Sequence, residues 1–140
     1  CVAIIDVDGF KRINDSYTHA AGDDVLKTVA QAIRESVRES DLPARLGGDE
    51  FVILFQHTGL EVARQVCERL HAALARLRWA HLSAALRVSV SIGVSEAEPG
   101  DTPASLLRRS DSAMFRAKAG ASGEAGATSD ASVASMPSRP

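Results

Sequence analysis

The apolar residues of this chain alternate between the spacing of a buried strand and that of an amphipathic helix, and their order limits the possible folds more than any other feature. Strands are identified by short runs rich in β-branched side chains, and helices by apolar residues three and four positions apart. The predicted elements are, in order, a strand over 2–7, a helix over 23–38, a hairpin over 42–55, a helix over 62–77, a strand over 87–94 and a helix over 103–118.

This order predicts an α+β fold in which helices flank a mixed central β-sheet, as in ferredoxin-like or palm-type domains. A chain of 140 residues, of which 45% are hydrophobic, can bury one core and is too short for two. Beyond Gly120 the sequence consists mainly of Ala, Ser and Gly, which cannot offset the entropy of ordering. We therefore expect one domain over residues 1–119 and a disordered tail over residues 120–140.

The composition limits which binding partners and which cellular compartment are expected. The formal net charge of −2 gives no overall basic field, so a nucleic-acid polymer is not an expected partner and any phosphate site must be local. Two cysteines, Cys1 and Cys67, do not make a disulfide framework, which favours the cytoplasm. No apolar run reaches membrane-spanning length, so this piece is expected to make no membrane contact. Because the chain opens directly into a strand, we expect a larger protein, and a membrane anchor upstream is left open.

Four carboxylates fall at the ends of predicted strands. Asp6 and Asp8 close the first strand, and Asp49 and Glu50 lie at the tip of the hairpin. If the two strands are neighbours, these acids repel one another unless cations bind, and oxygen ligands of this kind suit Mg²⁺. The alternative is that they are ordinary solvated residues of two turns.

Gly47 and Gly48 stand beside two of these acids. Two glycines allow a backbone to approach a bulky charged ligand, although by themselves they indicate only a turn. The full run Arg45-Leu46-Gly47-Gly48-Asp49-Glu50-Phe51, however, resembles the GGDEF signature of diguanylate cyclases at every position. Residues 6–15, 90–94 and 110–118 resemble further blocks of that family, as do the positions of Tyr17, His19, Gly22 and Asp23, so the similarity covers residues 2–120.

The resemblance implies a palm-like, nucleotidyl-cyclase-like fold and a reaction that joins two GTP molecules into cyclic di-GMP and releases two pyrophosphates, with Mg²⁺ or Mn²⁺ as cofactor. It implies that Asp6, the backbone carbonyl of Val7, Asp49 and Glu50 hold the metal, and that Asp49 also acts as the base. Two cations would neutralise the triphosphate and lower the pKa of the attacking ribose hydroxyl. Because each domain binds one GTP, the reaction requires a homodimer.

The resemblance also implies residues that bind the substrate. Lys11 corresponds to a stabiliser of the transition state, and Gly47 and Gly48 to the turn beside the phosphates. The remaining matches are the guanine-recognising pair Asn14 and Asp23, a histidine near the nucleotide, His19, and a phosphate ligand on the last helix, Lys118. Plainer alternatives stay open, namely an exposed lysine beside a turn for Lys11, a helix N-cap for Asp23, a structural histidine for His19 and a lysine favoured by the helix dipole for Lys118.

An inhibitory site for the product is implied by a second match. Arg38-Glu39-Ser40-Asp41 resembles the RxxD element of the family at the expected distance before Gly47, and Arg69 on the next helix is expected to assist it. An arginine fork can bind a phosphate and a carboxylate can bind a guanine edge. The alternative is a local pair between Arg38 and Asp41 at the end of a helix.

Three departures from the family pattern bear on activity. Thr18 stands where glycine is usual, and threonine would be strained if the backbone there were left-handed. Ser122 stands where an arginine is usual, and the tail replaces the closing strand of the family. The helix that normally precedes the first strand is also missing, which would leave one face of the sheet exposed.

Three functions therefore compete. The first is an active diguanylate cyclase with product inhibition, which the intact signature favours. The second is an inactive GGDEF module that binds GTP or senses cyclic di-GMP, which Thr18, Ser122 and the missing helix favour. The third is a palm-type enzyme that acts on another nucleotide, which does not account for Asn14, Asp23 and the RxxD element together.

Overall fold

The structure is a computed structural model that describes residues 1–123 and 133–135. Its elements follow the order β1 (Val2–Val7), α1 (Phe10–Ser16), α2 (His19–Ser36), β2 (Leu42–Gly47), β3 (Glu50–Leu54), α3 (Leu60–Arg76), β4 (Val90–Ser95), α4 (Pro103–Gly123) and β5 (Val133–Ser135). The five strands form one sheet in the order β2-β3-β1-β4-β5, in which only the β4–β5 pair is parallel. The predicted α+β fold with a mixed sheet and flanking helices is confirmed.

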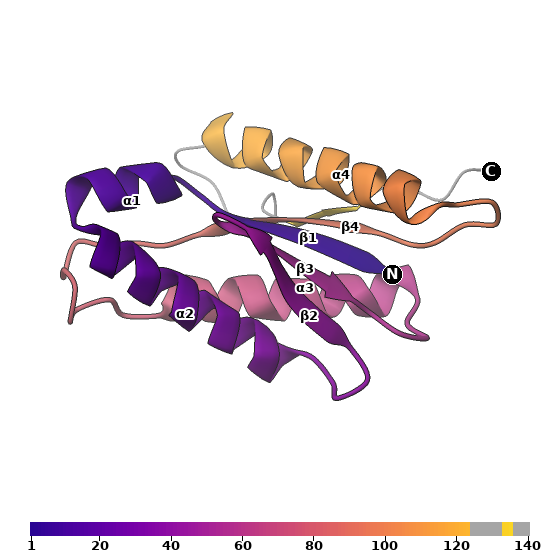
Figure 1. Cartoon of the computed structure of the whole chain (residues 1–140), viewed down its shortest axis with the longest axis horizontal. Helices are drawn as coiled ribbons and strands as arrows, with labels where there is room; N and C mark the ends of the chain where they lie inside the picture. The colour runs from indigo at the N-terminus through magenta and orange to yellow at the C-terminus, as the bar shows by residue number, and fades with distance from the viewer. Residues whose placement is uncertain (124–132, 136–140) are drawn as a thin grey trace.

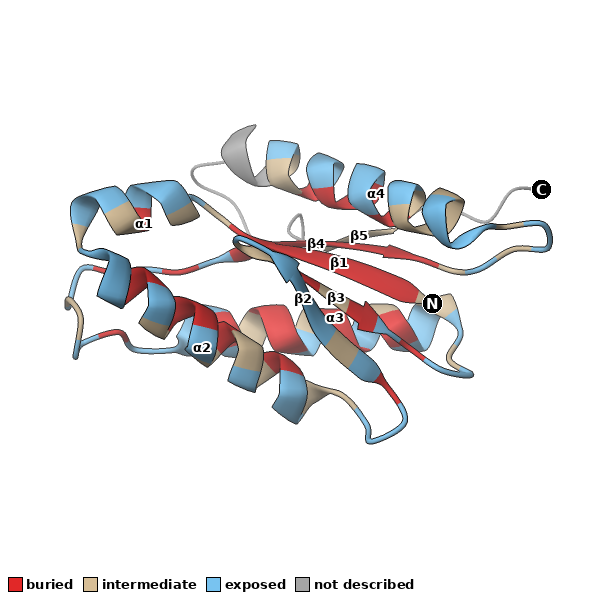
Figure 2. Ribbon diagram, viewed as in Figure 1, coloured by how far each residue is buried: buried red, intermediate tan, exposed pale blue. Residues whose placement is uncertain are grey.

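Helices cover both faces of the sheet (Figure 1). Helices α2 and α3 pack on one face, over a core formed by alternate residues of β1, β3 and β4 together with the apolar stripes of the two helices. Helix α4 packs on the other face, over β1 and β4. Strand β1, at the centre, is buried along its whole length (Figure 2), which explains its continuous apolar run.

The outer strands are less covered. Leu42, Leu46 and Leu54, on β2 and β3, are 54%, 52% and 42% exposed. Because helices lie on both faces, the expectation that one whole face of the sheet is exposed is wrong, and the exposed leucines are confined to β2 and β3. None of the described helices is both long enough and apolar enough to cross a membrane.

The start of helix α2 differs from the prediction. Helix α2 begins at His19 rather than at residue 23, because the Thr18 hydroxyl accepts a hydrogen bond from the Ala21 N–H at 3.0 Å and caps the helix. The backbone of Thr18 is extended, with φ −163°, so the left-handed conformation that would strain a threonine is not adopted. The suggestion that Asp23 caps the helix is wrong for the same reason.

The short helix α1 was not predicted, because Ile13 is its only buried residue and gives no apolar stripe. Helix α4 begins as predicted, with the Thr102 hydroxyl accepting from the Ser105 N–H at 3.1 Å.

The expectation of disorder after residue 119 is wrong where the chain is described. Helix α4 continues to Gly123, and residues Val133–Ser135 form β5, paired with Ile92–Val94 of β4. A closing strand is therefore present, although the sequence analysis expected the tail to replace it. Residues 124–132 and 136–140, and the side chain of Ser122, lie outside the described part of the chain.

Candidate active site

The end of β1 and the tip of the β2–β3 hairpin meet at one edge of the sheet (Figure 1). Asp6 pairs with Glu50 in the β1–β3 register, and the Val7 N–H donates to the Asp49 carbonyl at 3.1 Å. Antiparallel pairing produces this contact, because β1 ends beside the residue at which β3 begins. The two acidic segments therefore come together as predicted.

Asp6 is the buried acid of this group, with 7% of its surface exposed. Its carboxylate accepts from the ammonium of Lys118, on α4, at 2.6 Å. Burial raises the pKa of Asp6 above its ordinary value, the Lys118 contact opposes this shift, and the nearby charges of Asp49 and Asp8 add to it. The contact with Asp6 also raises the pKa of Lys118. A buried carboxylate with acidic neighbours favours a positive partner, and Lys118 provides one.

Asp8 is held by residues that the sequence analysis did not select. Its carboxylate accepts from the hydroxyls of Ser89 and Ser91, each at 2.7 Å. On the α3 side lies His71, whose pKa is lowered by burial while the charge of Asp8 opposes the shift. The alternation of valine and serine in the predicted strand was the only signal for the two serines. These contacts give each carboxylate oxygen of Asp8 a hydroxyl donor.

The turn that carries the glycines is braced from its own hairpin. Gly47 and Gly48 have φ values of 145° and 54°, conformations that other residues adopt only with strain. The Arg45 guanidinium donates to the Gly48 carbonyl at 2.6 and 3.0 Å. A Cβ added to either glycine would meet nothing within 4 Å, so the space beside the turn is open to a ligand.

Helices α1 and α2 lie in contact near the two residues predicted to bind guanine. Asn14, on α1, packs against Gly22 of α2, whose next residue is the exposed Asp23. Lys11 is exposed on α1, and no described contact engages its side chain. His19 is the exposed first residue of α2.

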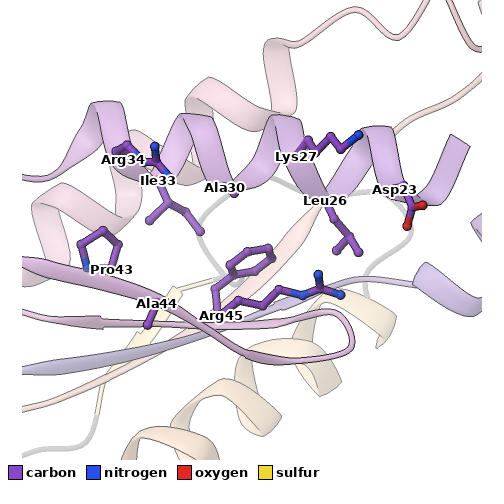
Figure 3. A pocket seen from close by; sticks show the side chains of 10 residues that line it. Asp23, Leu26, Lys27, Ala30, Ile33, Arg34, Pro43, Ala44 and Arg45 are labelled. Atoms are coloured by element: carbon purple, nitrogen blue, oxygen red, sulfur yellow. The ribbon is translucent and has the colours of Figure 1, made fainter. Parts of the chain in front are cut away.

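A cavity of about 380 Å³ lies between α2 and the hairpin. In Figure 3, Asp23 and Leu26 of α2 and Arg45 of β2 point toward the same end of this cavity. Its middle is apolar, with Ile33 and Phe51 among the lining residues. A flat ring with a polar edge directed at Asp23 matches this lining.

A sequence model described as "Diguanylate cyclase, GGDEF domain" matches residues 1–124. The chain belongs to the GGDEF family. It is 42% identical over 117 residues to diguanylate cyclase DgcP of Pseudomonas aeruginosa and 44% identical over 119 residues to the response regulator PleD of Caulobacter vibrioides. The alignments cover 84% and 83% of this chain and 17% and 26% of those proteins. The GGDEF domain thus spans about a quarter or less of these curated relatives.

Solved GGDEF domains share the fold. The active GGEEF domain of a diguanylate cyclase from Vibrio cholerae superposes with a TM-score of 0.83 at 27% identity, covering 99% of this chain and 83% of that one. The GGDEF domain of DgcB from Caulobacter crescentus in complex with c-di-GMP gives a TM-score of 0.82 at 28% identity, covering 96% and 76%. The GGDEF domain of PA1120 from Pseudomonas aeruginosa gives 0.82 at 38% identity, covering 99% and 82%.

The aspartate of the RxxD element, Asp41, is buried and makes hydrogen bonds within the fold. Asp41 is 6% exposed, and its carboxylate accepts from the backbone N–H groups of Arg38 at 3.1 Å and Gln56 at 3.3 Å. The side chains of Arg38 and Arg69 are exposed. Within residues 1–123 and 133–135, no contact joins the Arg69 side chain to Arg38 or Asp41. Asp41 therefore pairs with the backbone of Arg38, and not with its guanidinium.

The acidic edge, formed by Asp6, Asp49 and Glu50, is the candidate binding site for a metal ion. No three histidine, cysteine, aspartate or glutamate side chains of the described residues are grouped so that they could hold an ion by themselves. The acids predicted to hold the metal are Asp6, Asp49 and Glu50, and the charges of Asp6 and Asp49 interact. Mg²⁺ commonly takes one or two carboxylates and completes its shell with water and phosphates. The donor set fits Mg²⁺ that binds together with a nucleotide.

Proposed function

We propose that this GGDEF domain is an active diguanylate cyclase that condenses two GTP molecules into cyclic di-GMP and two pyrophosphates. The observation that carries the proposal is the junction of β1 with the hairpin, where Asp6 pairs with Glu50 and Val7 contacts Asp49 beside the open Gly47–Gly48 turn. Homology to named diguanylate cyclases at about 40% identity supports the same reaction.

Asp6, the Val7 carbonyl, Asp49 and Glu50 would hold Mg²⁺ or Mn²⁺. When bound, the metal would neutralise the triphosphate and lower the pKa of the ribose 3′-hydroxyl. In the proposed reaction Asp49 accepts the proton of that hydroxyl. The 3′-oxygen of the ribose then attacks the α-phosphorus of the second GTP, and pyrophosphate leaves in line. The half-buried position of Asp49 at the hairpin tip supports this role.

The remaining site residues bind the substrate in this proposal. Asp23 accepts from N1 and N2 of guanine, and the Asn14 amide donates to the O6 side of the base. Lys11 and Lys118 bind phosphate oxygens, and His19 lies beside the nucleotide at the start of α2. The Lys118 ammonium group contacts Asp6 at the acidic edge. Phosphates bound with the metal would lie at the same place.

The reaction needs two such domains, because each has one guanine-binding corner and the product contains two guanines. We propose that the catalytic unit is a homodimer in which the sites face each other. We place the protein in the cytoplasm, where GTP is available. The thiols agree with a reducing compartment, because Cys1 and Cys67 are both free, and burial raises the pKa of the Cys67 thiol to about 12.

We propose further that product binds at Arg38 and Asp41, with Arg69 as a third contact, and inhibits the enzyme. The exposed guanidinium groups of Arg38 and Arg69 support phosphate binding. Asp41 has both carboxylate oxygens engaged with backbone N–H groups, so its contribution to a guanine edge relies on their remaining lone pairs.

The test is incubation of the protein with GTP and Mg²⁺, followed by mass spectrometry for cyclic di-GMP. Formation of cyclic di-GMP that stops as product accumulates, and that continues in Arg38→Ala, supports both the activity and the inhibitory site. GTP binding with no product from a dimeric sample would favour the non-catalytic module. A cyclic product from ATP but none from GTP would favour a palm-type enzyme for another nucleotide.

A further inference from the structure

Gly22 occupies a position whose backbone does not require glycine. It is buried in the first turn of α2, where its N–H donates to the Thr18 carbonyl at 3.0 Å. It is not one of the glycines with a positive φ, so alanine could adopt the same conformation. Alanine is also the better helix former. The reason for glycine must therefore lie in what surrounds it.

The space that a side chain would fill at Gly22 belongs to Asn14. A Cβ built on Gly22 would lie 1.9 Å from Asn14 Oδ1, 2.9 Å from Asn14 Cγ and 3.2 Å from Phe10 Cζ. The carbonyl end of the Asn14 amide thus lies against the backbone of α2. The amide nitrogen is not among these three nearest atoms, so it lies farther from this Cβ than the carbonyl oxygen does.

The polar groups of Asn14 remain available to a ligand. Asn14 is half-buried, and its side chain makes no hydrogen bond to the part of the chain that the structure describes. Its contact is with Gly22, the residue that precedes Asp23 on α2. An outward NH₂ group beside a carboxylate provides donors next to acceptors. Guanine presents O6 beside its N1 and N2 hydrogens, whereas adenine presents an amino group and an unprotonated N1.

We propose that Gly22 supports guanine binding in this domain, because its missing side chain seats the Asn14 amide with the NH₂ group toward the O6 side of the base. Gly22 acts as a positioning residue and does not itself touch the nucleotide. The inference rests on the proposed function, in which Asn14 and Asp23 bind guanine.

The substitution Gly22→Ala tests this role without removing the fold. The nearest atoms to the added methyl group belong to the end of the Asn14 side chain, which can turn aside. At Gly93, by contrast, a Cβ would lie 2.1 Å from the backbone of Ser110 and of Met114, which cannot move without displacing α4. Gly22→Ala is therefore expected to fold and to lose the orientation of Asn14.

The measurement is calorimetric binding of a non-reacting α,β-methylene analogue of GTP in the presence of Mg²⁺, together with the thermal unfolding midpoint. Gly22→Ala should weaken the analogue roughly tenfold, the loss of one hydrogen bond, while the midpoint stays within a few degrees of the original. Gly59→Ala is the matched control, because its added Cβ meets only Glu96 Oε1, at 3.8 Å, in ordinary contact. The control should bind the analogue unchanged.

A double-mutant cycle separates this inference from the proposed function. In an Asn14→Ala background, adding Gly22→Ala should cause no further loss of affinity, because the amide is already gone. Equal losses in both backgrounds, or unchanged affinity in Gly22→Ala alone, would overturn the role of Gly22. If Asn14→Ala itself bound the analogue normally, the guanine-binding part of the proposed function would fail instead. The inosine analogue, which lacks N2, should lose affinity to the same degree as the guanosine analogue in Gly22→Ala.

Discussion

Two groups of carboxylates in this domain are used in opposite ways. At the end of β1, Asp6 lies with Asp49 and Glu50, its pKa is raised by burial, and its partner is a lysine from a distant helix. Asp41 lies just before β2, at the opposite end of the β2–β3 pair. It is equally buried, but backbone N–H groups of Arg38 and Gln56 satisfy both of its oxygens. The comparison teaches that burial does not by itself mark a functional acid. What distinguishes the acids is whether backbone N–H groups or a lysine side chain neutralises them.

The largest effect that would test this distinction is the loss of activity in Asp6→Asn. The amide cannot replace an ionised ligand beside Asp49, so formation of cyclic di-GMP should fall by at least about 100-fold. The thermal midpoint should change little, because a carboxylate whose pKa is raised by burial adds little to folding at neutral pH. Asp15→Asn, at an exposed position of α1, serves as the control. Full activity in Asp6→Asn would end the metal assignment.

Asp41→Ala should show the opposite pattern. Two backbone N–H groups would lose a charged acceptor, which costs about 2 kcal/mol of stability. The thermal midpoint should then fall by roughly 5 to 10 °C. Glu39→Ala, in the same turn but exposed, should leave it unchanged. If Asp41→Ala retained the original midpoint, the two groups of acids would not differ as described. Arg38→Ala is thus the cleaner test of product inhibition, because its exposed guanidinium supports no described contact in the fold.

The extent to which the sequence predicted the fold depended on the apolar pattern of each element. Strand β1 was predicted with its observed bounds, because all six residues are buried and the run is continuous. Helix α3 was predicted, but Val62 and Leu77 of its expected apolar face are 41% and 36% exposed, since the buried stripe runs through Ala63 and Cys67 instead. The strand β5 gave no signal, because three small or β-branched residues gain stability only by pairing with β4.

The site was predicted where the chemistry lies in a contiguous motif. The signature located Asp49, Glu50 and the two glycines, and the apolar run located Asp6. The contact between Lys118 and Asp6 spans 112 residues of sequence and depends on how α4 crosses the sheet. The contacts of Ser89 and Ser91 with Asp8 depend likewise on strand register. These side-chain contacts between distant elements could not be predicted from one sequence.

Lys118→Gln tests whether the Lys118 ammonium group and Mg²⁺ compete for Asp6. Without the ammonium group, Asp6 keeps its acidic neighbours and loses its positive partner, so Mg²⁺ should bind several-fold more tightly in the absence of nucleotide. The GTP analogue should bind roughly tenfold more weakly, because a charged phosphate contact is removed. Arg108→Gln, exposed on the same helix, controls for the lost positive charge. Equal Mg²⁺ affinity in Lys118→Gln and the original protein would show that Lys118 and Mg²⁺ do not compete for Asp6.

The smallest expected effect concerns Asp101, which resembles Asp41 in using the backbone. Its carboxylate accepts from the Glu98 N–H at 2.8 Å and from Ser105 and Arg109, and these contacts, led by the backbone one, lower its pKa from 3.8 to about 2. A lowered pKa means that its stabilisation is complete above pH 3.8 and is lost as the pH falls toward 2.

Asp101→Asn should therefore lower the unfolding midpoint slightly at neutral pH and flatten its decline in that acidic window, as followed by circular dichroism. Asp111→Asn, at an exposed position of α4, should leave the acidic decline intact. An unchanged decline in Asp101→Asn would mean that the acid sensitivity of the fold comes from other carboxylates. In that case backbone-neutralised acids such as Asp41 and Asp101 could not be treated as one class, and the contrast with Asp6 would rest on Asp41 alone.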